Sequence, residues 1–415
     1  MSDPESAHPD DAHNEESRKE GVPSAESRHE GVRGEESRNE GVRSEESPVD
    51  AAATRAARVF PCTNCGAALR FAPGVGTLTC STCGTQNALP TFDNSAIAKA
   101  HEELDYRTAI QLAKGNEAAI DAQIVECPQC GAQTRFDPNV VASVCAFCAT
   151  PMVSAKAHTG RQIRPSAIVP FKLETSAAQD FFRKWIGGRW FAPNALKKTV
   201  NQVEGVRGVY LPCWTFDAET SSHYEGQRGV HRQVQERVSD GKGGTITQTR
   251  IVTDWYHTNG NVDVAFDDTL VLASSSIPEH LADVLANWDV SHLEPFTDDF
   301  VAGFTVEAYQ LALEPAFGKA QEIFRLEIER AAQRDIGGDE QRVTNVETQY
   351  GNVAFKHILL PVWICSYKFA NKSWRVVVNG QTGAVKGDRP WSPWKIGFAV
   401  LAALTIVLIL YSANQ

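Results

Sequence analysis

Between residues 94 and 124, apolar side chains recur at roughly helical spacing in the sequence NSAIAKAHEELDYRTAIQLAKGNEAAIDAQI. The segment is rich in Ala, Glu, Leu and Lys, has no Pro, and spaces Ile97, Leu104, Ile110 and Ile120 among polar residues. Such spacing places the apolar side chains on one helix face, although Gly115 weakens the middle. The pattern predicts one or two helices, and we assign residues 93–125 to a helical spacer.

Residues 166–390 mix two periodicities and predict one α+β domain. A helix is expected from Thr175 or Ser176, which are good caps, to Gly187, and another over residues 316–334. Stretches rich in aromatic and β-branched residues lie between turn signals and predict strands, among them GVYLPCWTFDAET, TQTRIVTDWYHTNG and VDVAFDDTLVLAS. Residues 210–229 resemble residues 359–385 in their Leu-Pro-x-Trp start and later Gly-rich turn. We therefore expect two strand hairpins in this domain.

An uncharged apolar run occupies residues 396–411, and it predicts a transmembrane helix over residues 395–413. Trp391 and Trp394 before the run, and Tyr411 at its end, are aromatic residues typical of membrane interfaces. A buried core helix is the alternative, but such a helix rarely lies so near the end of a chain. Three basic residues precede the run, namely Lys386, Arg389 and Lys395. The sequence thus predicts a single-pass, tail-anchored protein of the cytoplasmic membrane with its body in the cytoplasm.

The first 50 residues contain a decapeptide repeat, EESRKEGVPS, AESRHEGVRG and EESRNEGVRS. They hold 15 Asp and Glu against 6 Lys and Arg, which accounts for most of the net charge of −11. With so few apolar residues the repeat buries too little surface to offset the entropy of ordering. We expect residues 1–55 to be a disordered acidic tail, either a solvated linker or a spacer for a basic partner. The rest of the chain is nearly neutral.

Eight of the ten cysteines lie in two copies of one pattern, CTNCGAALRFAPGVGTLTCSTC from residue 62 and CPQCGAQTRFDPNVVASVCAFC from residue 127. Each copy has two CxxC pairs separated by 14 residues, a spacing suited to tetrahedral zinc. We predict two zinc-ribbon modules, at residues 58–92 and 126–160. The predicted metal ligands are Cys62, Cys65, Cys80, Cys83, Cys127, Cys130, Cys145 and Cys148. The expected cofactor is Zn²⁺, two per chain, with iron in a redox site as the rival because four thiolates also bind iron.

The two copies share further residues at an offset of 65, including Phe71 with Phe136 and Pro73 with Pro138. One difference concerns the last CxxC pair, where Ala149 stands in place of Gly84. Four thiolates per ion leave no open coordination position, so these metals are not expected to catalyse hydrolysis.

The remaining cysteines, Cys213 and Cys365, lie in apolar runs and are expected to be buried thiols. No apolar export segment is present near Met1, and CxxC pairs are typical of metal sites rather than of disulfides between loops. We therefore predict a reducing compartment.

Motifs of common enzymes are missing from the sequence, which contains no nucleotide-binding P-loop, no HExxH and no GxSxG. Polar groups do gather in HYEGQRGVH and DWYH, which contribute His223, Tyr224, Glu225, His231, Asp254 and His257. Histidines on a sheet surface explain these residues more simply than an active site does. The prediction is a protein that is not an enzyme, and no catalytic residue is assigned.

Several stretches together resemble a family of bacterial TFIIB-type zinc-ribbon membrane proteins. They are the CxxCGA pairs, RWFAP, LPCWTFDAET, AGFTVEAY, IGGDEQ, FKHILLPVW and VNGQTGAVKGDRP. The resemblance covers about residues 60–412. It implies a membrane protein with zinc ribbons but no established activity, since members are largely of unknown function. Members often carry a primosomal replication restart helicase label, which shares paired CxxC modules. This chain lacks the nucleotide loop of that helicase.

The leading functional hypothesis is a membrane-tethered cytosolic scaffold or adaptor that uses its paired zinc ribbons to recognise a macromolecule, most simply a protein. The alternative is a nucleic-acid-binding protein associated with replication, without helicase activity of its own. Its basis is a weak excess of basic residues around the ribbons, namely Arg55, Arg58, Arg70, Arg135, Lys156, Arg161 and Arg164. An enzyme with a site near His223 and His257 is a third hypothesis. The partner and the oligomeric state are not specified by the sequence.

Overall fold

The computed structural model describes residues 61–115, 119–136, 142–199, 205–239, 241, 243–282, 288–370 and 372–413. The chain divides into two units, Met1–Thr54 and Arg55–Gln415, and the description below concerns the second. The acidic tail predicted over residues 1–55 lies outside the described residues. So do Arg55 and Arg58.

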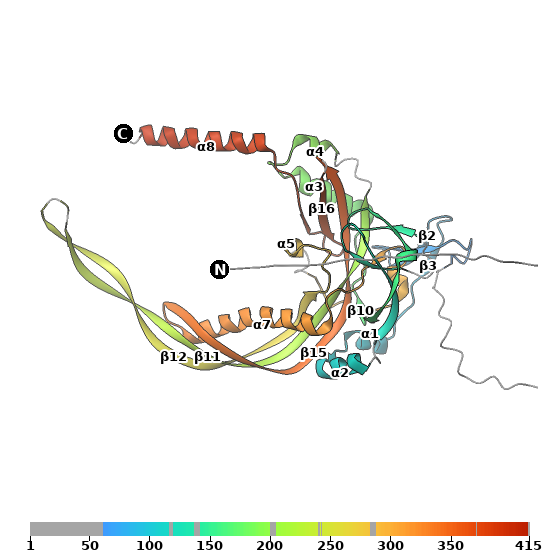
Figure 1. Ribbon diagram of the computed structural model, residues 1–415, viewed down its shortest axis with the longest axis horizontal. Coiled ribbons are helices and arrows are strands. Elements are labelled where there is room, and N and C mark those ends of the chain that lie inside the picture. Colours follow the sequence, from blue (N-terminus) through green and yellow to red (C-terminus); the bar gives the residue numbers. More distant parts are fainter. Residues whose placement is uncertain are drawn as a thin grey trace, which may run out of the picture. The chain divides into compact units, whose positions relative to one another are not determined.

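A large mixed sheet forms the centre of the second unit, built on three very long strands (Figure 1). These are β11 (Val206–Ser239), β12 (Thr245–Leu272) and β15 (Glu340–Phe369), with β11 between the other two. Short strands complete the sheet: β4 (Leu104–Asp105), β10 (Ala167–Ile168), β13 (Glu294–Pro295), β14 (Thr305–Val306), β16 (Lys372–Asn379) and β17 (Val385–Gly387). The parallel pairs are β10 with β15 and β11 with β14, so the sheet is mixed. The predicted α+β class is confirmed.

The hairpin expected over residues 210–229 is wrong, because β11 runs through this segment without a turn. Its polar residues alternate in burial, with Thr220, Ser222 and Tyr224 facing the protein interior. A period of two is compatible with a strand even where the inward residues are small and polar. The two similar segments instead lie side by side, with Tyr210 opposite Pro361. The second expected hairpin is confirmed, since β15 turns back into β16.

One long helix, α7 (Leu313–Ile336), packs on the central strands and buries an apolar stripe against them (Figure 1). Phe324 is fully buried and stacks on Phe266 of β12 at 4.1 Å between ring centroids. The helices predicted near residues 175 and 316 are confirmed as α3 (Thr175–Gly187) and α7. Three shorter helices are α4 (Asn194–Thr199), α5 (Glu279–Ala282) and α6 (Asp298–Val301).

The spacer between the cysteine patterns is helical in its first part only. It contains α1 (Asn94–His101) and α2 (Tyr106–Gly115). The helix expected through residue 125 is wrong there, because β5 (Ala119–Glu126) occupies that end. Ala122 and Ile124 are buried while Asp121 and Gln123 are exposed, which is the alternation of a strand rather than of a helix.

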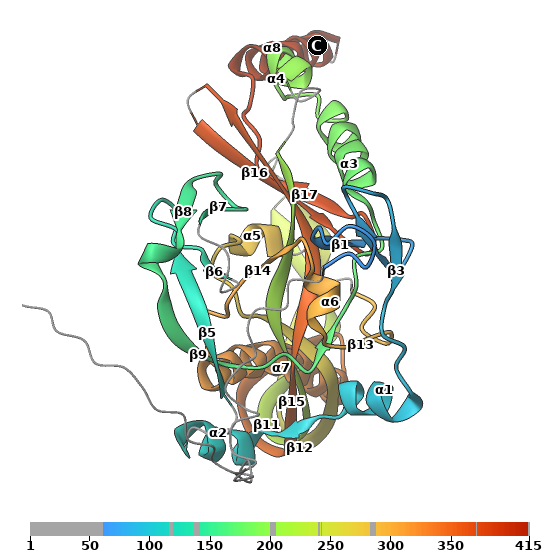
Figure 2. The same cartoon turned by 90° about the vertical axis from the view of Figure 1, so that its right-hand side faces the viewer.

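Both cysteine patterns fold as small antiparallel sheets (Figure 2). The first module, residues 61–89, contains β1 (Leu69–Ala72), β2 (Thr77–Cys80) and β3 (Gln86–Ala88). The second module, residues 119–163, contains β5 and the remaining elements β6 (Gln133–Arg135), β7 (Ala142–Val144), β8 (Pro151–Val153), η1 (Ser154–Lys156) and β9 (His158–Ile163). The second module therefore begins earlier than predicted, because β5 pairs with both β6 and β9.

The last helix, α8 (Pro393–Ala413), spans 21 residues with a mean hydropathy of 2.4 over its most apolar window. None of that window is buried within the protein. In length and composition it can cross a membrane. The single apolar helix predicted at this end of the chain is thus confirmed.

Candidate metal centres

Each CxxC pair forms the same tight turn, which turns both sulfurs toward one point. In the first turn the amide of Gly66 donates to the carbonyl of Cys62 at 2.9 Å, and the amide of Cys62 donates to the carbonyl of Ala67 at 2.7 Å. The other three turns repeat both bonds, with Gly84, Gly131 and Ala149 in the position of Gly66. That position has a positive φ in all four turns, from 63° to 73°. The backbone therefore gives all four CxxC pairs the same geometry.

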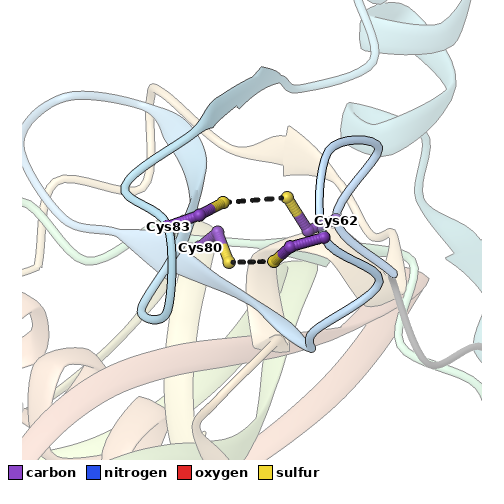
Figure 3. Close-up of side chains that lie close together, drawn as sticks. Cys62, Cys80 and Cys83 are labelled. Carbon is purple, nitrogen blue, oxygen red and sulfur yellow. Dashed lines mark hydrogen bonds between the residues drawn. The ribbon is translucent and has the colours of Figure 1, made fainter.

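The eight predicted ligands come together as two sets of four. Figure 3 shows the first set, with Cys62, Cys80 and Cys83 labelled. Within each set all four sulfurs lie within 4.8 Å of one another. In the first module Cys62 and Cys83 are 3.5 Å apart, as are Cys65 and Cys80. In the second, the matching separations are 3.4 Å and 3.6 Å. All eight thiols are free rather than joined in disulfides.

These separations fit a tetrahedral metal. Four sulfurs at about 2.3 Å from one zinc ion would lie about 3.8 Å from each other. The observed values are shorter by only a few tenths of an ångström. The donor set is four soft thiolates with no oxygen or nitrogen ligand, which favours Zn²⁺ and also accepts iron.

Hydrogen bonds stabilise some of the thiolates. The hydroxyl and then the amide of Thr85 lower the pKa of Cys83 to about 5. For Cys65 the Ala67 amide acts to lower the pKa, but the neighbouring sulfurs of Cys83 and Cys80 raise it to about 12. Four negative sulfurs at this spacing repel one another, so a cation is needed for all of them to ionise. A divalent ion supplies that charge.

Two threonines near the sulfurs were not singled out from the sequence. Thr85 Oγ1 lies 3.1 Å from Cys83 Sγ, and Thr150 Oγ1 lies 3.2 Å from Cys148 Sγ. Burial opposes ionisation of Cys148, yet the hydroxyl and amide of Thr150 lower its pKa to about 7. The two threonines share the offset of 65 residues, and this repeat was the signal that could have revealed them.

The second module is embedded in the body. Its last CxxC turn, including Cys145, Ala146 and Phe147, is buried. From the main sheet, Arg207 donates to the Cys145 carbonyl at 3.2 Å, and Ser366 donates to the Phe147 carbonyl at 2.7 Å. Through β6 it also bonds to the segment after β14, where the Ala308 amide donates to the Gln133 carbonyl at 2.9 Å.

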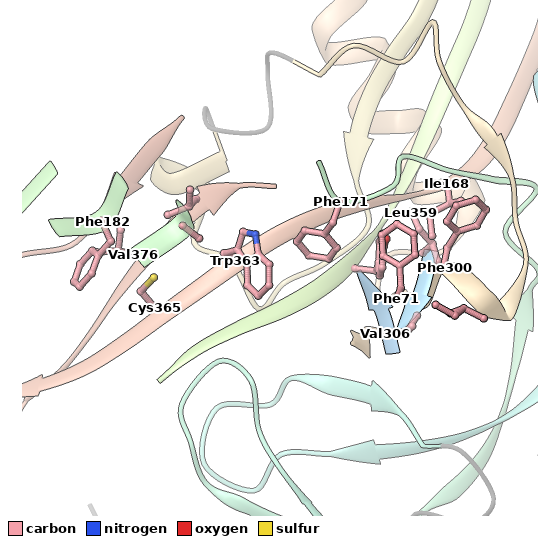
Figure 4. Packing of buried hydrophobic residues seen from close by; sticks show 14 of the residues in the cluster. Phe71, Ile168, Phe171, Phe182, Phe300, Val306, Leu359, Trp363, Cys365 and Val376 are labelled. Atoms are coloured by element: carbon pink, nitrogen blue, oxygen red, sulfur yellow. The ribbon is translucent and has the colours of Figure 1, made fainter. Parts of the chain in front are cut away.

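The first module packs on the body through its strands, while both of its cysteine turns remain exposed. Phe71 contacts Phe300 at 5.6 Å between ring centroids and joins a cluster with Phe171 and Trp363 (Figure 4). In contrast, residues 63–66 and 81–84 are exposed, including the ligands Cys65 and Cys83. The two modules thus share the same CxxC turns and differ at the last of them, which is exposed in the first module and buried in the second.

A third group of possible ligands is an ion-pair network. Carboxylates of Glu103, Asp217 and Asp268 lie within 4.8 Å of one another. The buried ammonium of Lys356 lies 3.0 Å from Glu103 and 2.7 Å from Asp268, so it already supplies a positive charge. Burial and the neighbouring Glu103 raise the pKa of Asp217 to about 7. We assign this group a structural role.

The polar residues considered for an active site do not converge. His223 pairs with Asn261 at 3.0 Å, Tyr224 donates to Asp335 at 2.5 Å, and His231 pairs with Glu340 at 2.9 Å. Asp254 forms a separate ion pair with Arg232 at 2.8 Å. Each group is satisfied at its own position along the long strands.

Two of the basic residues near the modules also contact apolar neighbours. The aliphatic part of Arg70 lies against Gly303, and the Arg164 guanidinium lies 5.8 Å from the centroid of the Phe296 ring. Cys213 and Cys365 are both fully buried, as predicted, and burial raises the pKa of each thiol.

Comparison with known proteins yields one relative of similar length. The chain is 25% identical to the uncharacterized protein YdjG of Bacillus subtilis (strain 168) over 340 residues, which cover 81% of this chain and 91% of YdjG. No family model matches the chain. No solved structure matches it.

Proposed function

We propose that this protein is a membrane-tethered scaffold whose two four-cysteine modules are zinc ribbons with different tasks. The first module recognises a protein partner, and the second is a metal staple that completes the α+β body. The single observation that carries this division is the burial of the last CxxC turn, which is exposed in the first module and buried against the main sheet in the second.

Corresponding residues show the division most directly. Ser81 and Thr82, between the last two ligands of the first module, are exposed. At the offset of 65 the second module has Ala146 and Phe147, both buried against the sheet. A rigid, metal-held loop with polar exposed residues suits recognition of another macromolecule, whereas an apolar loop beneath the sheet suits folding. Four thiolates per ion leave the metal no open position for catalysis.

The tether in this proposal is α8, inserted in the cytoplasmic membrane with the body in the cytoplasm. Lys386, Arg389 and Lys395 flank its first residue, which favours that orientation. The resemblance to TFIIB-type zinc-ribbon membrane proteins agrees with the proposal. The similarity to YdjG extends over most of both chains, but its name assigns no activity.

The test is affinity capture of the full chain from detergent-solubilised membranes. We expect Thr82→Arg to lose the proteins that co-purify with the natural chain, because the added side chain projects from the exposed turn of the first module. The control is Gln129→Arg, which changes an exposed residue in a turn of the second module. It should retain them.

Both variants must still contain two zinc ions per chain, which shows that both modules remain folded. Retention of every partner by Thr82→Arg, or equal loss in both variants, would remove the recognition role from the first module. Turnover of nucleotide or of a generic ester by the purified chain would contradict the hypothesis that the protein is a scaffold and not an enzyme.

A further inference from the structure

The loop between α3 and α4 is fixed to the first turn of α8, about 200 residues further along the sequence (Figure 2). Lys395 Nζ donates to the carbonyls of Trp190 and Ala192, both at 2.9 Å, and to Oδ1 of Asn194 at 2.8 Å. The amide of Ser392 donates to the carbonyl of Phe191 at 2.8 Å. All three ammonium protons are therefore used to hold this loop against the helix start.

This clamp sets the position of the loop relative to a membrane. If α8 spans the bilayer, as the proposed function states, its first turn lies at the headgroup region, and the loop lies there too. Exposed aromatic side chains support this placement, since Trp190 is 70% exposed and Trp394 is 88% exposed. Tryptophan at such a site is stabilised by the polar and apolar mixture of the interface.

Each of the two segments that the clamp joins carries an arginine, Arg189 in the loop and Arg389 before α8. The Arg189 guanidinium lies 4.8 Å from the Trp185 ring centroid, and the Arg389 guanidinium lies 4.4 Å from that of Trp391. Partial burial, and then the positive charge of Arg189, lower the pKa of Arg389. The Ser392–Phe191 hydrogen bond, and the Phe191 and Trp391 rings at 5.9 Å between centroids, hold the two segments that carry these arginines side by side.

Within the described part of the chain, neither guanidinium forms an ion pair with a carboxylate. Asp388, next to Arg389, is engaged by His280 at 2.8 Å. In addition, Nε of Arg189 is buried and has no hydrogen-bond partner among the described residues. Such a donor is costly unless an acceptor reaches it.

We propose that Arg189 and Arg389 together bind the phosphate of one anionic phospholipid headgroup at the membrane surface. A phosphate oxygen accepts hydrogen bonds from the accessible N–H groups of both planar guanidiniums, and its negative charge offsets theirs. The flanking Trp190 and Trp391 rings lie against the glycerol and upper acyl region of the same lipid. The site makes the α3–α4 loop a second membrane contact, beyond the span itself.

The experiment measures lipid retained by the purified full chain. The chain in neutral detergent is equilibrated with equal amounts of phosphatidylglycerol and phosphatidylcholine, washed, and the bound lipids are counted by mass spectrometry. We expect the natural chain to retain phosphatidylglycerol about tenfold over phosphatidylcholine. Arg189→Gln combined with Arg389→Gln should abolish the preference. Arg325→Gln combined with Arg330→Gln, which removes the same charge from α7, should leave it unchanged.

A second pair of substitutions keeps the test decisive if the glutamine variant does not fold. Arg189→Lys with Arg389→Lys preserves the charge but loses the forked donors, so the preference should fall several-fold. Equal retention of the two lipids by the natural chain would overturn the proposal. So would a loss of the phosphatidylglycerol preference in the Arg325→Gln, Arg330→Gln control as large as in the Arg189→Gln, Arg389→Gln variant. Displacement of phosphatidylglycerol by inorganic phosphate at similar concentration would also overturn it, because the site would then bind a free anion.

The outcome is separable from failure of the tether. Alkaline carbonate extraction of membranes reports whether α8 is inserted at all. A chain that resists extraction but shows no lipid preference contradicts only the headgroup site. A chain that is extracted contradicts the span on which this inference rests.

Discussion

Ala149 is the residue at which the four cysteine turns differ. It holds a φ of 63°, where the other three turns have glycine, and at this φ a Cβ is strained. The Ala149 side chain is exposed, so its methyl group gains little packing in exchange. We expect Ala149→Gly to raise the free energy of unfolding by about 1 kcal/mol. Denaturant titration of the zinc-loaded chain measures the change.

Gly84→Ala is the matched control for this prediction. It places the same methyl group at a φ of 72° in the first module, so stability should fall by a similar amount. A neutral effect of both substitutions would show that the turns relax and that the strain is absent.

Single ligand substitutions test the metal stoichiometry and the division between the modules. Cys65→Ser and Cys130→Ser remove corresponding ligands, and each should lower the zinc content from two ions to one. Cys130→Ser should also lower the melting temperature of the body, by about 5 °C or more and by more than Cys65→Ser does, because the last CxxC turn of the second module is buried under the main sheet whereas both turns of the first are exposed. Elemental analysis and calorimetry read the two effects. Equal thermal effects, or a natural chain with one ion, would contradict the assignment.

At the residue scale the sequence predicts correctly that the eight cysteines gather in two sets of four, because two CxxC pairs at this spacing have few other arrangements. It also contains the asymmetry between the modules, since Ser81 and Thr82 match Ala146 and Phe147 in the repeat. No role was predicted from this difference between the two loops. The arginine pair and the Lys395 clamp could not be predicted, because they join residues about 200 positions apart.

At the scale of elements, Glu307 lies where the second module meets the main sheet, since its backbone pairs with Thr134 of β6 and its amide donates to the carbonyl of Tyr210 in β11. It follows β14, is 1% exposed, and accepts a hydrogen bond from Ser276. Burial raises its pKa from near 4.5 to about 7, although Ser276 acts in the opposite direction. The folded chain therefore binds an extra proton between these pH values, and this residue makes stability fall as pH rises through that window.

Glu307→Gln removes this dependence. Relative to the natural chain, the variant should gain stability between about pH 4.5 and 7 and stay ahead at higher pH, by up to roughly 3 kcal/mol. At pH 4 the two should be nearly equal. Unfolding midpoints across this range provide the measurement, and a difference that is constant with pH would show that Glu307 does not titrate there.

An element is predictable when its hydrophobic residues follow only one spacing, that of a helix or that of a strand. It is not predictable when the same residues fit both spacings. α3, α7 and α8 are found near their expected bounds. Residues 119–125 were assigned to a helix because Ile120 also fits a helical spacing, although the adjacent residues alternate. The length of β11 was missed because a polar stretch looks like a turn, whereas pairing with β12 and β15 on both sides satisfies its backbone.

At the scale of the whole molecule, the last prediction concerns α8 as the proposed membrane anchor. Leu404 lies near the middle of α8 and is 56% exposed, so in a bilayer it would face lipid or a neighbouring helix. A charge there costs about 3 kcal/mol on insertion scales, whereas a charge at the helix end reaches the interface. Leu404→Arg should therefore shift the chain from the carbonate-resistant membrane fraction to the soluble one, and Ser412→Arg should not. If neither variant leaves the membrane, α8 is not what anchors the chain. The α3–α4 loop with its exposed Trp190 then becomes the leading candidate for the membrane anchor.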